Sequence, residues 1–320
     1  MYCINIYTIE PFSDLQIEQI QNALECHVQY IPRENFNSFN DIDNIEILIC
    51  RDRDAIVDIV NACSNLKMMF VISAGVEKLP FDLLRERNII VANAKGVNAK
   101  VIATYVMSYI TSFAANSFEN LENQKKHYWK YYQTVERINE KSLLIVGTGH
   151  IGSEIAKYAK AMGLNVIGIR RSPNNSSLPN FDEIDTYHNI EKYIPAADFI
   201  VLCCPLTAET RNLFDSQRIG LIKSTCVFMN VARSGLVDMD ALYETMCSSK
   251  IKAAVIDVFP KEPISENDRW WSTPNVIVTP HSSGRTPNYK EDVLKPLIEN
   301  IFAYLQGQDI PNRVDLINQY

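Results

Sequence analysis

Glycine is scarce in this chain, with 11 among 320 residues, and long apolar runs are absent. The low glycine content excludes a collagen-like repeat, and no run approaches the roughly 18 apolar residues that a membrane-spanning helix needs. Basic residues are outnumbered by acidic ones, 31 to 38, which argues against a nucleic-acid binder that relies on a basic surface. The hydrophobic fraction of 47% is ordinary for a globular protein.

The eight cysteines are scattered and form no CxxC pair, so we expect buried free thiols rather than disulfides or a metal site. The first residues, MYCINIYTIEPF, lack the basic start and long apolar core of a signal peptide. We therefore expect a cytoplasmic protein that binds neither a membrane nor a nucleic acid.

Short apolar runs alternate with helical patterns along the whole chain. This alternation predicts an α/β fold with parallel sheets buried on both faces. Two series of strand-like runs are present, and they cover 4–9, 45–50, 68–73 and 89–94, and then 142–147, 164–169, 198–204, 225–232, 253–259 and 275–280. We expect helices over 151–163 and 239–250, one long helical segment over 97–121 between the two series, and a C-terminal helix over 287–307 that returns to the first.

Three of the 11 glycines fall in one six-residue window that follows the run SLLIV and precedes the helical pattern. A strand, GxGxxG, a helix and a further strand are the context of a dinucleotide-binding loop, in which pyrophosphate sits at the helix N-terminus. The predicted cofactor loop consists of Gly147, Thr148, Gly149, His150, Ile151 and Gly152.

The end of the next strand usually decides between NAD and NADP, because an acid there binds the ribose 2′-hydroxyl of NAD. This chain has Arg170, Arg171 and Ser172 instead. Two guanidinium groups and a hydroxyl suit a 2′-phosphate, so we expect a preference for NADP(H), with NAD(H) also possible.

Three more segments follow strands of the second series, namely NVARSGLVD (230–238), DVFPKEP (257–263) and TPHSSG (279–284). Together with the glycine loop, SAGVEKLP (73–80) and CCPLTAETRNLF (203–214), they resemble the D-isomer-specific 2-hydroxyacid dehydrogenase family. The motifs HSSG and AGVEKLP most resemble those of its glyoxylate/hydroxypyruvate reductase-like branch.

The resemblance implies two doubly wound parallel-sheet domains with a cleft between them. A flavodoxin-like substrate domain would comprise residues 1–97 and 286–320, and a Rossmann NAD(P)-binding domain, 98–285, would be inserted in it. The resemblance also implies a homodimer, for which 97–121 and the aromatic HYWKYY (127–132) are candidate interface segments.

The family's roles carry over to matching positions. Arg233 would hold the substrate carboxylate and polarise its carbonyl, His281 would be the acid–base group, and Glu262 would orient His281. The substrate carboxylate would also bind the backbone of Ser73, Ala74, Gly75 and Val76. Further cofactor contacts would come from Pro205, Thr207, Val231, Ala232 and Asp257. Trp271 would serve packing, whereas Trp270 would reach the cleft or a neighbouring subunit.

The leading hypothesis is thus the NAD(P)H-dependent reduction of a small 2-keto acid, such as glyoxylate or hydroxypyruvate, to the D-2-hydroxy acid. Phosphoglycerate is less expected, because no regulatory domain fits after residue 320, and formate is disfavoured by the presence of Glu262. Two alternatives stay open, a dinucleotide-sensing protein resembling the family's transcriptional corepressors and a protein of the same fold with an inactive site.

Overall fold

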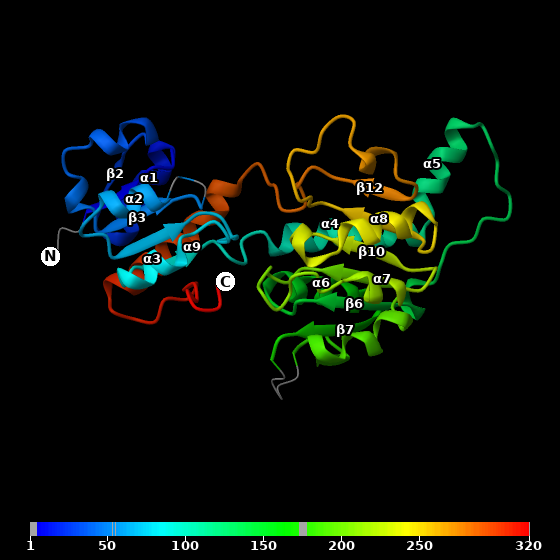
Figure 1. Cartoon of the computed structure of the whole chain (residues 1–320). Coiled ribbons are helices and arrows are strands. Elements are labelled where there is room, and N and C mark those ends of the chain that lie inside the picture. Colours follow the sequence, from blue (N-terminus) through cyan, green and yellow to red (C-terminus); the bar gives the residue numbers. More distant parts are fainter. Residues whose placement is uncertain (1–4, 53, 55, 173–177, 320) are drawn as a thin grey trace. The chain divides into compact units, whose positions relative to one another are not determined.

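The computed structural model describes residues 5–52, 54, 56–172 and 178–319. The chain divides into two compact units, one made of Met1–Val97 with Thr286–Tyr320 and the other of Asn98–Arg285 (Figure 1). Each unit contains its own parallel sheet covered by helices, and each is described separately below. No helix among the described residues is long and apolar enough to cross a membrane.

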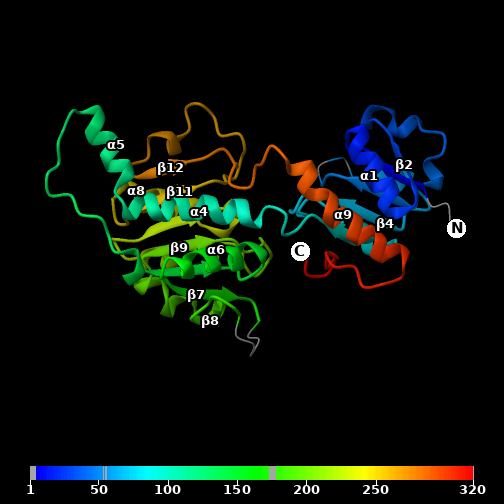
Figure 2. The ribbon, with the colours of Figure 1, turned by 180° about the vertical axis from the view of Figure 1, so that it is seen from behind.

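The first unit is built on a five-stranded parallel sheet with the order β2-β1-β3-β4-β5, the arrangement of flavodoxin-like folds. Every residue of β3 and β4 is buried, as expected for strands with helices on both faces. The C-terminal helix α9 lies beside α1 on one face of this sheet (Figure 2). The strands are β1 (Asn5–Thr8), β2 (His27–Tyr30), β3 (Ile47–Cys50), β4 (Met68–Val71) and β5 (Ile90–Asn93), and the helices are α1 (Asp14–Leu24), α2 (Ile56–Ala62), α3 (Phe81–Glu86) and α9 (Tyr289–Leu305).

The second unit is built on a seven-stranded parallel sheet with the order β12-β11-β10-β9-β6-β7-β8. The chain order reverses at β6, which lies between β9 and β7, as in a Rossmann fold. The strands are β6 (Ser142–Val146), β7 (Asn165–Arg170), β8 (Glu183–Thr186), β9 (Phe199–Leu202), β10 (Val227–Asn230), β11 (Ala253–Ile256) and β12 (Val276–Val278).

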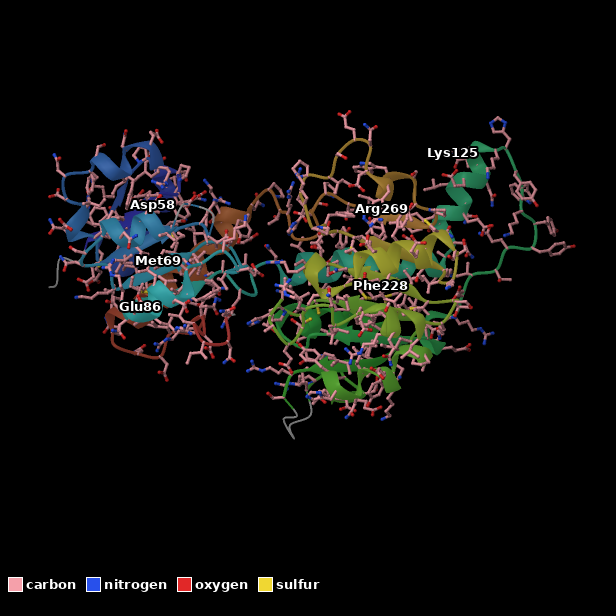
Figure 3. The ribbon with its side chains drawn as sticks, viewed as in Figure 1. Asp58, Met69, Glu86, Lys125, Phe228 and Arg269 are labelled. Carbon is pink, nitrogen blue, oxygen red and sulfur yellow. The ribbon has the colours of Figure 1, made fainter. Side chains whose placement is uncertain are left out.

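Helices cover both faces of this second sheet. Apolar side chains of α4 (Ala99–Ala114) and α6 (His150–Ala161) pack on one face, while α7 (Ser216–Gly220) and α8 (Met239–Cys247) pack on the other. Phe228 of β10, labelled in Figure 3, is fully buried against Phe214 with their rings edge to face at 5.2 Å. The two-face burial explains why the strands of this unit are apolar along their whole length.

The long helical segment predicted over 97–121 is in fact two helices. It ends as α4 at Ala114, the chain turns at Asn116 with a left-handed φ of 52°, and α5 (Ser117–Lys125) begins. The reason lies in the sequence beyond Ala115, which turns polar, so that α5 buries none of its side chains. Figures 1 and 2 show α5 and the segment after it extending away from the second sheet.

Two predictions about single residues and strands also need correction. Strands β2 and β8 were missed because both are short edge strands with partly exposed side chains. The roles predicted for the paired tryptophans are reversed. Trp270 is 4% exposed and packs edge to face on Tyr243 and Phe259, whereas Trp271 is 54% exposed and donates its indole hydrogen to the carbonyl of Ser265.

Candidate active site

The glycine loop follows β6, at the point where the strand order of the second sheet reverses. Open α/β sheets bind ligands at the carboxyl ends of their strands at such a point. Gly147 has a φ of 110°, which only glycine adopts readily, and a Cβ there would lie 2.7 Å from the backbone nitrogen of Cys204. Its N–H donates to the carbonyl of Ile169 on β7 at 2.8 Å, so the loop starts tightly against two neighbouring strands.

The other two glycines of the loop differ in what surrounds them. A Cβ on Gly149 would meet nothing within 4 Å, and this residue caps α6 without any side-chain hydrogen bond to the helix. A Cβ on Gly152 would instead overlap the carbonyl oxygen of Gly147. The space beside Gly149 at the start of α6 is thus open, and the turn is too tight for a side chain at Gly152. Both features fit a dinucleotide pyrophosphate.

Strand β7 ends at Arg170, beside the glycine loop. Arg170 is half-buried and pairs in register with Thr186 of β8, whereas Arg171 and Ser172 are exposed. No carboxylate occurs at these three positions, so the edge that would face an adenosine ribose is basic. The cofactor's 2′-phosphate would find two guanidinium groups here.

Strand β9 ends in two cysteines and a turn that contains Pro205 and Thr207. The Cys203 thiol lies 3.1 Å from the carbonyl oxygen of Gly147, and burial raises its pKa, which makes it a poor nucleophile. Thr210 is 2% exposed and fixes the turn, since its hydroxyl accepts from the Thr207 N–H and donates to the Pro205 carbonyl. Thr210 was not among the residues predicted from the sequence.

Arg233 is positioned by Asn230, the last residue of β10. The amide of this fully buried asparagine donates to the carbonyl of Arg233 at 3.0 Å and accepts from the N–H of Ala232 at 3.1 Å. Val231 and Ala232 are buried and the backbone is extended at Arg233. The Arg233 side chain is partly exposed and donates from Nη1 to the carbonyl of Ala232 at 2.7 Å. Asn230 is thus a second residue that the sequence reasoning did not single out.

Asp257 follows β11 and is fully buried, where it organises the loop that carries His281. Its carboxylate accepts hydrogen bonds from the Thr279 hydroxyl at 2.6 Å and from the N–H groups of Ser282 at 2.9 Å and Ser283 at 3.0 Å. The Tyr105 hydroxyl of α4 lies 2.6 Å from the Thr279 oxygen. Since Thr279 donates to Asp257, Tyr105 donates to Thr279. Burial raises the pKa of Tyr105, with a contribution from the charge of Asp257, and so keeps its proton in place.

His281 and Glu262 form a hydrogen-bonded pair in this loop region. His281 has a left-handed φ of 50°, and its Nδ1 lies 2.7 Å from Oε2 of Glu262. The other oxygen of Glu262 accepts from the N–H of Phe259 at 2.8 Å. A carboxylate only accepts, so Nδ1 bears the hydrogen and Nε2 is left to exchange a proton. The side chains are 47% and 35% exposed, which leaves the imidazole reachable by a substrate.

In the first unit, the predicted carboxylate-binding loop, Ser73 to Val76, follows β4. The hydroxyl of Ser73 donates to Oδ1 of Asp52 at 3.0 Å and lies 3.2 Å from the carbonyl of Gly75. Asn93, which is 2% exposed, donates to the carbonyl of Ala74 at 2.7 Å. The side chain of Val76 is buried, so this residue presents only its backbone.

Asn93 is in turn tied to the C-terminal segment. The Asn312 amide donates to the carbonyl of Asn93 at 3.0 Å, and the N–H of Asn312 donates to the side chain of the fully buried Asn300 on α9 at 2.7 Å. Asn93 therefore braces the loop directly, and Asn312 and Asn300 of the C-terminal region hold Asn93 in place. None of the three was singled out from the sequence, because their hydrogen bonds join segments that are far apart in the chain.

Comparison with known proteins identifies the family of the chain. The NAD-binding domain model of the D-isomer specific 2-hydroxyacid dehydrogenase family matches residues 107–283, which is more than half of the 320 residues. The chain therefore belongs to this family of oxidoreductases, and the family predicted from the motifs is confirmed.

Two curated proteins that are similar to this chain carry different enzyme names. The chain is 30% identical over 319 residues to the D-3-phosphoglycerate dehydrogenase of Methanocaldococcus jannaschii, covering 98% of this chain but only 60% of that protein. It is 28% identical over 304 residues to the hydroxypyruvate reductase of Thermotoga maritima, covering 94% of this chain and 98% of that protein. The chain thus spans less than two thirds of the first relative and nearly all of the second.

A solved structure confirms the predicted fold class. The D-isomer specific 2-hydroxyacid dehydrogenase of Xanthobacter autotrophicus Py2, in complex with NADPH and MES, superposes with a TM-score of 0.85 at 22% identity, with 99% of each chain covered. At this identity the likeness establishes the fold of two parallel-sheet α/β domains.

Replacing Gly152 by alanine tests the glycine loop. The added methyl group would overlap the Gly147 carbonyl and push the loop away from the helix N-terminus, so we expect NADPH affinity to fall by at least about ten-fold, or about 1.4 kcal/mol. Fluorescence titration with NADPH measures this. Gly220→Ala is the matched control, because a Cβ there meets nothing within 4 Å. Equal affinity of the two variants would contradict the assignment of the loop.

Proposed function

We propose that the protein reduces a small 2-keto acid to the D-2-hydroxy acid with NADPH as the preferred reductant. The observation that carries this proposal is the hydrogen bond between His281 and Glu262, because it prepares one imidazole nitrogen for proton transfer while holding the other. Family membership supports the reaction class. The relative named hydroxypyruvate reductase, which the chain matches over nearly its whole length, supports glyoxylate or hydroxypyruvate as substrate.

Each group in the proposed site has a distinct task. The bound nicotinamide would supply the hydride to the carbonyl carbon. Arg233 would hold the 2-keto acid's carboxylate and polarise its carbonyl, and the loop from Ser73 to Val76 would bind the carboxylate through backbone N–H groups. With hydrogens on both ring nitrogens, His281 would donate the proton of Nε2 to the carbonyl oxygen and be left as the neutral imidazole with its hydrogen on Nδ1. Glu262 would hold the ring throughout by accepting the hydrogen bond from Nδ1.

The proposed preference for NADPH rests on the basic end of β7. Arg170, with Arg171 and Ser172, would hold the 2′-phosphate, while Gly147 to Gly152 would hold the pyrophosphate. Pro205, Thr207, Val231 and Ala232 would border the nicotinamide end. Asp257 would act there indirectly, because its buried carboxylate holds the backbone of the His281 loop. The Xanthobacter structure in complex with NADPH supports the same choice.

The activity and the cofactor preference are tested together by following NADPH and NADH oxidation at about 340 nm, with glyoxylate, hydroxypyruvate, pyruvate and a branched 2-keto acid. We expect turnover that favours NADPH. In Arg170→Asp, the loss of a guanidinium and the added negative charge should lower the NADPH-to-NADH ratio of kcat/KM by about ten-fold or more. Arg137→Asp is the control, since Arg137 is exposed and pairs with Glu140.

The outcomes separate the hypotheses. Turnover with NADH alone would contradict the cofactor preference and leave the reaction standing. Tight dinucleotide binding without turnover of any acid would instead support a dinucleotide-sensing protein of the corepressor type.

Replacing Glu262 by glutamine tests the acid–base pair. Glutamine places an NH₂ group toward either the Phe259 N–H or the imidazole, so one of the two hydrogen bonds is lost. We expect kcat for keto acid reduction to fall about a hundred-fold, with a smaller change in KM. Glu266→Gln, at an exposed position in the same loop, should keep wild-type kcat. A Glu262→Gln enzyme with unchanged kcat would refute the assignment.

We also propose that the protein is a homodimer that uses α5 and the segment after it. This segment exposes four large aromatic side chains, Tyr128 at 60%, Trp129 at 84%, Tyr131 at 77% and Tyr132 at 89%. Lys125, labelled at the end of α5 in Figure 3, marks where it begins. Clustered exposed aromatics are typical of protein–protein contact surfaces.

A double substitution, Trp129→Ser with Tyr132→Ser, tests the dimer. We expect wild type to sediment as a dimer and the variant as a monomer at micromolar concentration, because aromatic anchors dominate interface energies. Ile317→Ser is the control, since this residue is also large, apolar and 76% exposed but lies in the other unit. A wild-type monomer, or a variant that stays dimeric, would contradict the proposed interface.

A further inference from the structure

Asp52 lies directly beside the loop that we propose binds the substrate carboxylate. Strands β3 and β4 run parallel and adjacent, so the residues that follow them emerge at the same edge of the first sheet. Oδ1 of Asp52, two residues past β3, accepts a hydrogen bond from the Ser73 hydroxyl, two residues past β4, at 3.0 Å. The side chain of Asp52 is half-buried. The Asp52 carboxylate thus lies next to the loop proposed to bind the substrate carboxylate.

The neighbouring cation Arg51 does not serve this loop, because it is bound elsewhere. Arg51 donates from Nε and Nη2 to the two oxygens of Glu10, both at 2.7 Å, and the Glu10 side chain is only 7% exposed. Lys290 of α9 lies 3.0 Å from the same carboxylate. Burial alone would raise the pKa of Glu10, but Arg51 and Lys290 outweigh it and hold the pKa below its usual value. The arginine charge is therefore matched by a buried partner.

Two further groups near Asp52, Asp54 and Tyr289, add no positive charge. Asp54 accepts from the N–H of Arg51 at 2.6 Å. The Tyr289 hydroxyl donates to the carbonyl of Ile72. Burial, against the opposing charge of Arg51, raises the pKa of Tyr289 to about 12, so it is neutral at physiological pH. Asp52 and Asp54 therefore make the end of β3, beside Ser73, negative and hydrogen-bond-accepting.

We propose that Asp52 is a specificity-determining residue that selects 2-keto acids with a neutral, hydrogen-bond-donating group on the third carbon. This inference rests on the proposed function, because it assumes that the substrate carboxylate binds the loop from Ser73 to Val76. A hydroxyl on the third carbon can donate to Asp52, whereas a second carboxylate or a phosphate there is repelled by it. Repulsion of the wrong substrate is an effective route to discrimination.

The proposal distinguishes between the substrates that the two curated relatives' names suggest. A hydroxymethyl tail, as in hydroxypyruvate, suits the negative surface beside Ser73. A phosphorylated tail, as in the keto acid that corresponds to 3-phosphoglycerate, does not. The enzyme should therefore act on unphosphorylated monocarboxylic acids.

The experiment compares kcat/KM for three substrates, namely glyoxylate, which has no third carbon, hydroxypyruvate and oxaloacetate, which carries a second carboxylate. In Asp52→Asn, the oxaloacetate-to-glyoxylate ratio should rise by about ten-fold at low ionic strength, where screening of the charge is weak. Asp52→Glu, which keeps the charge, should keep the ratio low. Asp58→Asn, an equal charge change at the exposed α2 position labelled in Figure 3, should leave it at the wild-type value.

The outcomes are separable. Turnover of glyoxylate by all four proteins with an unchanged ratio in Asp52→Asn would overturn this inference alone. Equal shifts in Asp52→Asn and Asp58→Asn would also overturn it, because they would indicate a general charge effect. No turnover of any acid by the wild type would overturn the proposed function and this inference with it. Turnover of glyoxylate, which has no third carbon, serves as the check that the substituted unit of each variant is folded, and NADPH affinity checks the other unit.

Discussion

The hydrogen bonds of the buried Asp257 carboxylate, just past β11 in the second sheet, are the interaction on which the candidate site depends. A fully buried carboxylate is costly unless its oxygens are hydrogen-bonded, and Asp257 meets this condition with a hydroxyl and two backbone N–H groups of one loop. The same bonds hold the loop in a shape that includes the left-handed backbone of His281. The hydrogen bonds that the buried Asp257 requires thus fix the loop that carries His281, the residue proposed to transfer the proton.

In both units, a buried polar side chain at a strand end also holds a loop by hydrogen bonds to its backbone. Asn230 in the second unit and Asn93 in the first are buried at the ends of their strands, and each ties down the loop that follows or neighbours it. The loops that follow parallel strands all lie at one edge of the sheet. The backbone N–H and C=O groups of these loops have no partners within the sheet. Buried amide and carboxyl side chains supply the missing partners and so fix the loops that carry Arg233 and His281.

Local patterns in the sequence were sufficient for part of this structure. Apolar runs predicted ten of the strands, and the glycine spacing predicted the tight turn between β6 and α6, because both depend on residues that are neighbours in the chain. The roles assigned to Trp270 and Trp271 failed for the opposite reason. Which of two adjacent residues faces the core depends on the rotational phase of the short helix Arg269–Ser272, and that phase is set by Tyr243 and Phe259, which lie outside it in the sequence.

The sequence by itself determined the α/β class, the family and the identity of the residues proposed to react, since these follow from composition, periodicity and motifs. Only the tertiary structure decided how those residues are held. It brought Tyr105 to Thr279, Asn312 to Asn93 and Asp52 to Ser73, pairs in which the partners stand between 21 and 219 positions apart. Hydrogen bonds act over about 3 Å in space regardless of separation along the chain, so no local pattern could have revealed them.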